Sequence, residues 1–97
     1  MKADKKNVKI RYREVLYVEG IKDYVKIVCI DRTIVSKLMI GNMIDILPED
    51  QFIRIHRSYI ICIPNINAYS STSVEVHGKE IPIGRNYKHE TLNTLRQ

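Results

Sequence analysis

Hydrophobic and polar residues alternate along much of the chain, with the period of two that is typical of half-buried β-strands. In residues 52–56, for example, Ile53 and Ile55 fall on one face while Arg54 and His56 fall on the other. Comparable patterns predict further strands over residues 8–12, 15–18, 23–30, 33–36, 59–63, 66–69, 73–77 and 80–83. Short polar or glycine-containing stretches predict turns at 20–23, 31–32, 70–72 and 78–79. The pattern therefore predicts a mainly β domain of predominantly antiparallel strands.

The period changes in two places, and each change predicts a short helix. Apolar residues at 40, 43, 44 and 47 follow the i, i+3, i+4, i+7 spacing of an amphipathic helix that stops before Pro48. Its start lacks a polar cap because Met39 stands there. Asn86 can cap a closing helix near residues 87–95, in which Tyr87, Thr91 and Leu95 form a narrow apolar stripe.

The composition is that of one globular domain of 97 residues with 44% hydrophobic residues. No apolar run approaches the length of a membrane span, and the first residues do not show the pattern of a signal peptide. Cys29 and Cys62 lie in apolar strand patterns. We therefore expect buried, reduced thiols in a cytoplasmic protein, with a disulfide as the less favoured alternative.

The net charge of +5 is concentrated at the start of the chain. Residues 1–13 hold six Lys or Arg against Asp4, which leaves ten basic and ten acidic residues in 14–97. We expect residues 1–7 to form a basic leader that adds only non-specific affinity for nucleic acid, and residues 8–97 to form the domain. Within the domain, the acidic residues Asp45, Glu49 and Asp50 cluster away from Lys22, Lys26, Arg57 and Arg85.

The chain lacks the residue patterns of an enzyme or a metal site. Its three histidines are scattered and have no metal-ligand spacing, and its four glycines are isolated, so no phosphate-binding loop is present. Cys62 and His56 could form a nucleophile pair, but the apolar neighbours of Cys62 would keep its thiol protonated and inert. We expect no catalytic residue, no metal and no cofactor.

Arg57 interrupts a strand pattern, and Arg85 follows Gly84 after the last predicted strand. Both positions are corners from which a long side chain can protrude. Arginine can donate two parallel hydrogen bonds to guanine in the major groove of DNA, whereas lysine lacks this fixed fork. The alternative for each arginine is that it is simply solvated.

Several of these segments together resemble the LytTR-type DNA-binding domain, the output module of many bacterial response regulators. The resemblance covers residues 8–95 and rests on the order and spacing of EVLYVEG at 14–20, KDYVKI at 22–27, LP at 47–48, FIRIHRSY at 52–59 and IPI at 81–83. It implies a compact, almost wholly β fold that inserts loops, and no recognition helix, into successive major grooves. Met39 departs from the usual pattern at the helix start.

The resemblance also implies which residues touch DNA. By position, base contacts fall to Arg57, Arg85 and Asn86, and contacts of the backbone or loops to Lys22, Tyr24, Lys26, Ser58 and Lys88. His56 is expected to orient the corner at Arg57 through a hydrogen bond.

We therefore expect a sequence-specific, double-stranded DNA-binding transcriptional regulator of a two-component system. Its partners would be direct-repeat promoter sites and a receiver domain in the full-length protein, with no membrane, and the isolated domain would be monomeric. The alternatives are an RNA- or single-strand-binding β domain, whose exposed aromatics would stack on bases, and a protein-interaction module, which the neutral charge of residues 14–97 favours.

Overall fold

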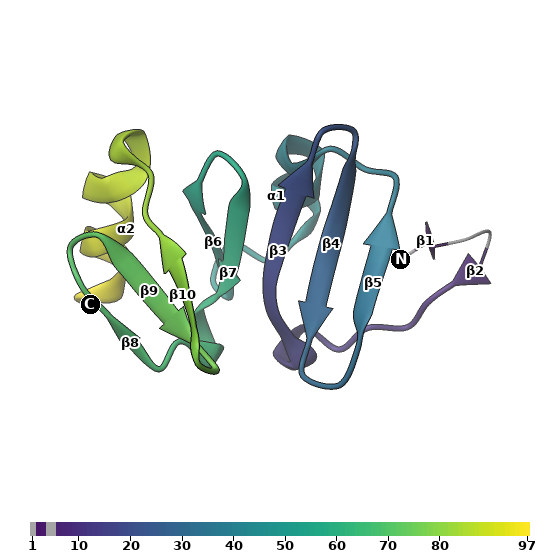
Figure 1. Ribbon diagram of the computed structural model, residues 1–97, viewed down its shortest axis with the longest axis horizontal. Helices are drawn as coiled ribbons and strands as arrows, with labels where there is room; N and C mark the ends of the chain where they lie inside the picture. Colours follow the sequence, from purple (N-terminus) through teal and green to yellow (C-terminus); the bar gives the residue numbers. More distant parts are fainter. Residues whose placement is uncertain (1, 4–5) are drawn as a thin grey trace.

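The computed structural model describes residues 2, 3 and 6–97, and most of its strands belong to two antiparallel sheets (Figure 1). The larger sheet has five strands in the order β5-β4-β3-β7-β6. These are β3 (Val15–Ile21), β4 (Tyr24–Cys29), β5 (Thr33–Ser36), β6 (Phe52–His56) and β7 (Tyr59–Cys62). The smaller sheet contains β8 (Ala68–Tyr69), β9 (Ser73–Val76) and β10 (Lys79–Pro82) in the order β10-β9-β8.

Short elements complete the fold. Two helices, α1 (Ile40–Ile46) and α2 (Lys88–Leu95), follow β5 and end the chain, respectively. Near the N-terminus, β1 (Lys2–Ala3) pairs with β2 (Lys6–Asn7). Three 3-10 turns are η1 (Tyr12–Glu14), η2 (Ile63–Asn65) and η3 (Arg85–Tyr87). The prediction of a mainly antiparallel β domain with two short helices is confirmed.

The hydrophobic core has two parts, which follow from the alternation of side chains across the five-stranded sheet. In β3 and β7, Val18 and Ile60 face a cluster completed by Met43 and Leu47 of the α1 region. Their neighbours Tyr17 and Ile61 face a second cluster, which the smaller sheet supplies with Val74, Val76 and Ile81. The central strands are thus buried on both faces.

Cys29 and Cys62 are both free and buried, as their apolar flanks predicted. Burial raises the pKa of each thiol above its usual value. The Sγ atom of Cys62 donates to the carbonyl of Tyr12 at 3.5 Å. The reactive thiolate is therefore disfavoured at both positions.

The first predicted strand, at residues 8–12, is wrong. Residues 8–11 have no regular structure, and Tyr12 begins η1. Val8 and Ile10 nevertheless pack against the core on the α1 side of the sheet. The alternation correctly separated apolar from polar positions, but it carries no information about whether a neighbouring strand is available for hydrogen bonding.

Several predicted boundaries also shift. β3 continues through Gly20 to Ile21. The strand predicted at 66–69 is reduced to β8, since Ile66 closes η2 by donating its N–H to the carbonyl of Ile63 at 3.1 Å. The turn predicted at 78–79 consists of His77 and Gly78, which have φ of 46° and 81°. Two successive positive φ values are typical of the tight type I′ hairpin turn.

Asn86 does not cap the closing helix, contrary to the prediction. It lies within η3, and α2 begins two residues later, at Lys88, without a side-chain cap. The backbone N–H of Tyr87 already bonds to the carbonyl of Gly84 at 2.9 Å, so the chain enters α2 through a 3-10 turn. In the predicted apolar stripe, Thr91 is buried, and so is its neighbour Leu92.

Candidate nucleic-acid interface

Three connections lie together along one edge of the molecule, the upper edge in Figure 1. They are the β3–β4 turn at Lys22 and Asp23, the β6–β7 turn at Arg57 and Ser58, and η3 between β10 and α2. We call this edge the turn edge. It unites segments that are separated by up to about sixty residues in sequence.

The β6–β7 turn is held in shape by His56. In the register of the two strands, Arg54 pairs with Ile60 and His56 pairs with Tyr59, so that Ile55 is the extra residue of a β-bulge. The backbone N–H of Ser58 donates to Nδ1 of His56 at 3.0 Å. Nδ1 of the imidazole is therefore the acceptor in this bond. His56 thus orients the corner by a hydrogen bond, as predicted.

The β6–β7 turn is joined to the neighbouring hairpin by a backbone hydrogen bond. The N–H of Gly20, near the end of β3, donates to the carbonyl of Ser58 at 2.8 Å. Below it, the hydroxyl of Tyr59 donates to Oε2 of Glu19 at 3.3 Å. Burial, and then the nearby Glu19 carboxylate, raise the pKa of Tyr59, so the phenol keeps its proton and this bond.

The same turn is joined to η3 on its other side. The N–H of Gly84 donates to the carbonyl of the bulged residue Ile55 at 2.7 Å. An ideal Cβ placed on Gly84 would lie 3.1 Å from Cδ2 of Tyr87 and 3.4 Å from Cα of His56. The glycine therefore permits η3 to approach the end of β6 closely. Two backbone bonds, one on each side, connect the three parts of the turn edge.

Most of the predicted contact residues lie on or beside the turn edge. Arg57, Arg85, Asn86, Lys22 and Lys88 are exposed, and Ser58 is half-buried. Tyr24 is half-buried at the start of β4. Lys26 is also half-buried but lies three residues after Asp23, about 10 Å from the turn at the usual rise of a strand, where it pairs with Glu19.

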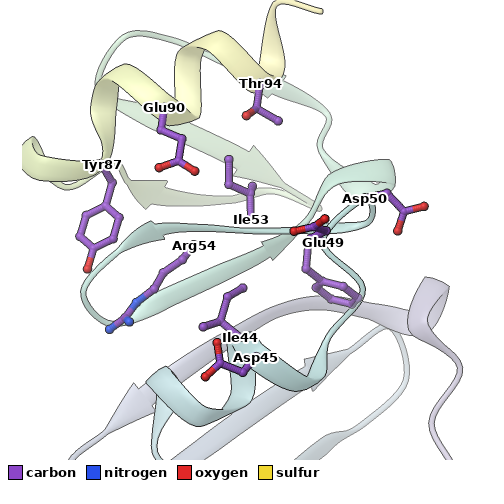
Figure 2. Close-up of a pocket in the computed structure, with 10 residues that line it drawn as sticks. Ile44, Asp45, Glu49, Asp50, Ile53, Arg54, Tyr87, Glu90 and Thr94 are labelled. Atoms are coloured by element: carbon purple, nitrogen blue, oxygen red, sulfur yellow. The ribbon is translucent and has the colours of Figure 1, made fainter.

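An acidic cleft of about 580 Å³ adjoins one end of the turn edge, between α1 and α2 (Figure 2). Its carboxylates come from Asp45, Glu49, Asp50 and Glu90. Phe52 and Ile53 also line it, and both are largely buried. The cluster of acidic residues predicted from the sequence is thus real, and its charge disfavours an approach of phosphate groups.

Arg54 and Tyr87 line the end of this cleft next to the turn edge (Figure 2). The guanidinium carbon of Arg54 lies 5.7 Å from the centre of the Tyr87 ring. The alternation in residues 52–56 predicts only that Arg54 lies on the polar face of the strand, and it indicates no further role. Its one local signal was a position three residues before Arg57, on the same strand pattern.

Among residues 2, 3 and 6–97, no three His, Cys, Asp or Glu side chains gather to hold a metal ion. Within the same residues, neither helix has the length and apolar content that crossing a membrane requires.

The sequence matches the family model described as "LytTr DNA-binding domain" over residues 5–96. No curated protein is significantly similar to it in sequence. Among solved structures, it is similar to the LytTr DNA-binding domain of a Bacillus cereus protein described as a methyl-accepting/DNA response regulator. The TM-score is 0.83 with 24% sequence identity, covering 97% of this chain and 92% of the other. Since the family match spans nearly the whole chain, the protein belongs to the LytTr DNA-binding domain family.

Proposed function

We propose that the domain binds double-stranded DNA sequence-specifically and regulates transcription, with the turn edge inserted into the major groove. The observation that carries this proposal is the gathering of three exposed connections along one edge by two backbone hydrogen bonds. The major groove is about 12 Å wide and admits a two-stranded β-ribbon, which is the form of the hairpins that end in Lys22 and Arg57.

The roles of the contact residues follow from their chemistry. Arg57 and Arg85, both exposed, would each donate a bidentate pair of hydrogen bonds to guanine, and Asn86 would bond to adenine. Lys22 and Lys88 would neutralise phosphates, with Tyr24, Lys26 and Ser58 in supporting contacts of the backbone or loops. Asp23 stands beside Lys22 and limits how closely a phosphate approaches that turn.

The biological setting is also part of the proposal. The Bacillus cereus relative is described as part of a response regulator. By analogy, this domain would be the output module of a two-component regulator in the cytoplasm, with a receiver domain in the full-length protein. We infer that pairs of domains occupy direct repeats, that the receiver supplies the contact between them, and that the isolated domain is a monomer.

Selection of bound sequences from a random duplex pool tests this function. We expect a selected duplex with defined guanine positions, and competition by the same sequence as single strands should be weak. Efficient competition by single-stranded DNA or RNA would favour a base-stacking module instead. If the domain binds no nucleic acid at all, a protein-interaction module is favoured. Each of these two results would overturn the proposal.

A further inference from the structure

Arg54 contacts two of the three parts of the turn edge with one side chain. Its Nη2 donates to the backbone carbonyl of Arg57 at 2.6 Å, and its Nε donates to the carbonyl of His56 at 3.4 Å. Its guanidinium also lies over the ring of Tyr87, which belongs to η3. The side chain is half-buried. It therefore bridges the β6–β7 turn and the segment that carries Arg85.

We propose that Arg54 is a positioning residue for DNA recognition, which sets the spacing of Arg57 and Arg85 without contacting DNA itself. The inference rests on the proposed function. Two side chains that read bases in one groove must be held to within about half an ångström of their productive geometry. Hydrogen bonds from a charged donor are stronger than neutral ones, and a cation above an aromatic ring adds further attraction.

The chemistry of the site explains why an arginine is required. The planar guanidinium offers Nε and Nη2 in a fixed fork, which matches the successive carbonyls of His56 and Arg57 while its face rests on Tyr87. A lysine has one ammonium group and no planar face. It could not make the two backbone bonds and the ring contact in the same geometry.

The surroundings of Arg54 argue against a role as a phosphate contact. The side chain lines the acidic cleft, together with the carboxylates of Asp45 and Glu90 (Figure 2). A phosphate approaching from that side would meet these negative charges. Two of the nitrogen atoms of Arg54 are already engaged with backbone carbonyls of its own strand and turn.

The backbone bond between Gly84 and Ile55 does not depend on Arg54. Loss of the guanidinium should therefore leave the fold and the approximate place of η3 intact. What should be lost is the fixed relation between two side chains that must act together. A positioning role therefore predicts altered base preference in a protein that is still folded, whereas a merely structural role predicts loss of the fold.

The test is the Arg54→Lys variant, which keeps the positive charge. On the selected duplex we expect affinity to fall about ten- to a hundred-fold, with relaxed preference at the base positions read by both Arg57 and Arg85. On random duplex the change should stay within about twofold, and the slope of log affinity against log salt should not change. Lys9→Met, at an exposed site whose carbonyl accepts a hydrogen bond from Arg32 beyond the far end of β4, serves as a charge-loss control for Arg54→Met away from the turn edge.

A second substitution distinguishes positioning from phosphate binding. If Arg54 acts through Arg57, then Arg57→Ala should cost much less affinity in the Arg54→Lys background than in the unaltered protein. Equal costs in the two backgrounds would overturn the inference. A salt slope lowered by about one in Arg54→Met, with unchanged base preference, would also overturn it and assign Arg54 to the phosphate backbone.

Tyr87 provides a matched pair of variants that leaves Arg54 in place. Tyr87→Phe keeps the ring and should retain the base preference at the position read by Arg85, whereas Tyr87→Leu removes the ring and should relax it. Thermal unfolding establishes that each variant is folded. If the unaltered protein selects no duplex, the proposed function fails; if it does but Arg54→Lys and Tyr87→Leu bind with unchanged preference, only this inference fails.

Discussion

The two hairpin turns of the turn edge differ in how firmly they are held. The β6–β7 turn is contacted by its own His56, by Arg54, and by backbone bonds from Gly20 and Gly84. At the β3–β4 turn, the exposed side chains of Lys22 and Asp23 make no hydrogen bond or ion pair within the described part of the chain. Under the proposed function, this difference matches the two roles. The β6–β7 turn would read bases and needs a fixed geometry, whereas the β3–β4 turn would neutralise phosphates and can adapt.

Substitution at the tip of each turn should give the largest difference between them. Arg57→Ala should cost about 1–3 kcal/mol of binding free energy on the selected duplex, and far less on random duplex. Lys22→Ala should weaken binding to both duplexes alike and reduce the salt slope by about one. Mobility-shift titrations at several salt concentrations measure both effects.

Arg57→Lys is the stricter control, because it keeps the charge and removes the planar fork. Unchanged affinity together with unchanged base preference in this variant would contradict a bidentate role, and would make the two turns equivalent.

The bond that joins the turns can be strained through Gly20. An ideal Cβ at Gly20 would lie 2.8 Å from Cβ of Ile40, the first residue of α1. Gly20→Ala should therefore lower the free energy of unfolding by about 1–3 kcal/mol. Gly41→Ala is the matched control, since its Cβ would have no neighbour nearer than 3.9 Å. Urea unfolding followed by circular dichroism compares them, and equal stability of the two variants would refute the expected clash.

Glycine should have opposite effects on stability at Lys22 and at Arg57. Lys22 has a φ of 54°, which glycine adopts more easily, so Lys22→Gly should raise the free energy of unfolding by about 0.5–1 kcal/mol. Arg57 is not among the described residues with positive φ, so Arg57→Gly should lower it by about the same amount. Denaturant unfolding of both variants measures the signs, and a shared sign would argue against this difference in backbone strain.

The smallest effect is expected at Thr91, on the helix that packs against β6. Its hydroxyl is fully buried and has no hydrogen-bond partner among the described residues. Thr91→Val keeps the shape and removes this group, so stability should change by less than about 0.5 kcal/mol or rise slightly. Thr91→Ser keeps the hydroxyl and loses a methyl group, which should cost about 1 kcal/mol. A Val variant less stable than the Ser variant would reveal a partner for the hydroxyl.

Local pattern was sufficient for most of the fold. The alternation of residues 23–30 predicted a strand, and its apolar positions Val25, Ile27 and Cys29 are buried on one face of β4; the spacing from Ile40 to Leu47 predicted α1. Both patterns report which side chains are buried within one element. Pairing is a different matter: residues 8–12 alternate as well as any strand, yet residues 8–11 have no regular structure.

The arrangement of the candidate site was less accessible from sequence. Arg57 and His56 could be singled out because they interrupt or end a strand pattern. The contact between Arg54 and Tyr87 joins residues 33 positions apart and depends on η3, whose 3-10 turn replaced the predicted cap at Asn86. The bulge at Ile55 likewise requires knowledge of the register with β7. These features arise from tertiary packing, which no local period encodes.

The two backbone bonds from Gly20 and Gly84 have a consequence for the redesign of specificity. Since each bond ties one connection to the next, exchanging a single turn for that of a relative would also displace its neighbours. Base preference in such chimeras should then change at positions that the grafted residues do not touch. If the turn edge reads DNA as proposed, its base preference cannot be changed through one connection alone. New specificities would have to be selected from variants in which all three connections are varied together.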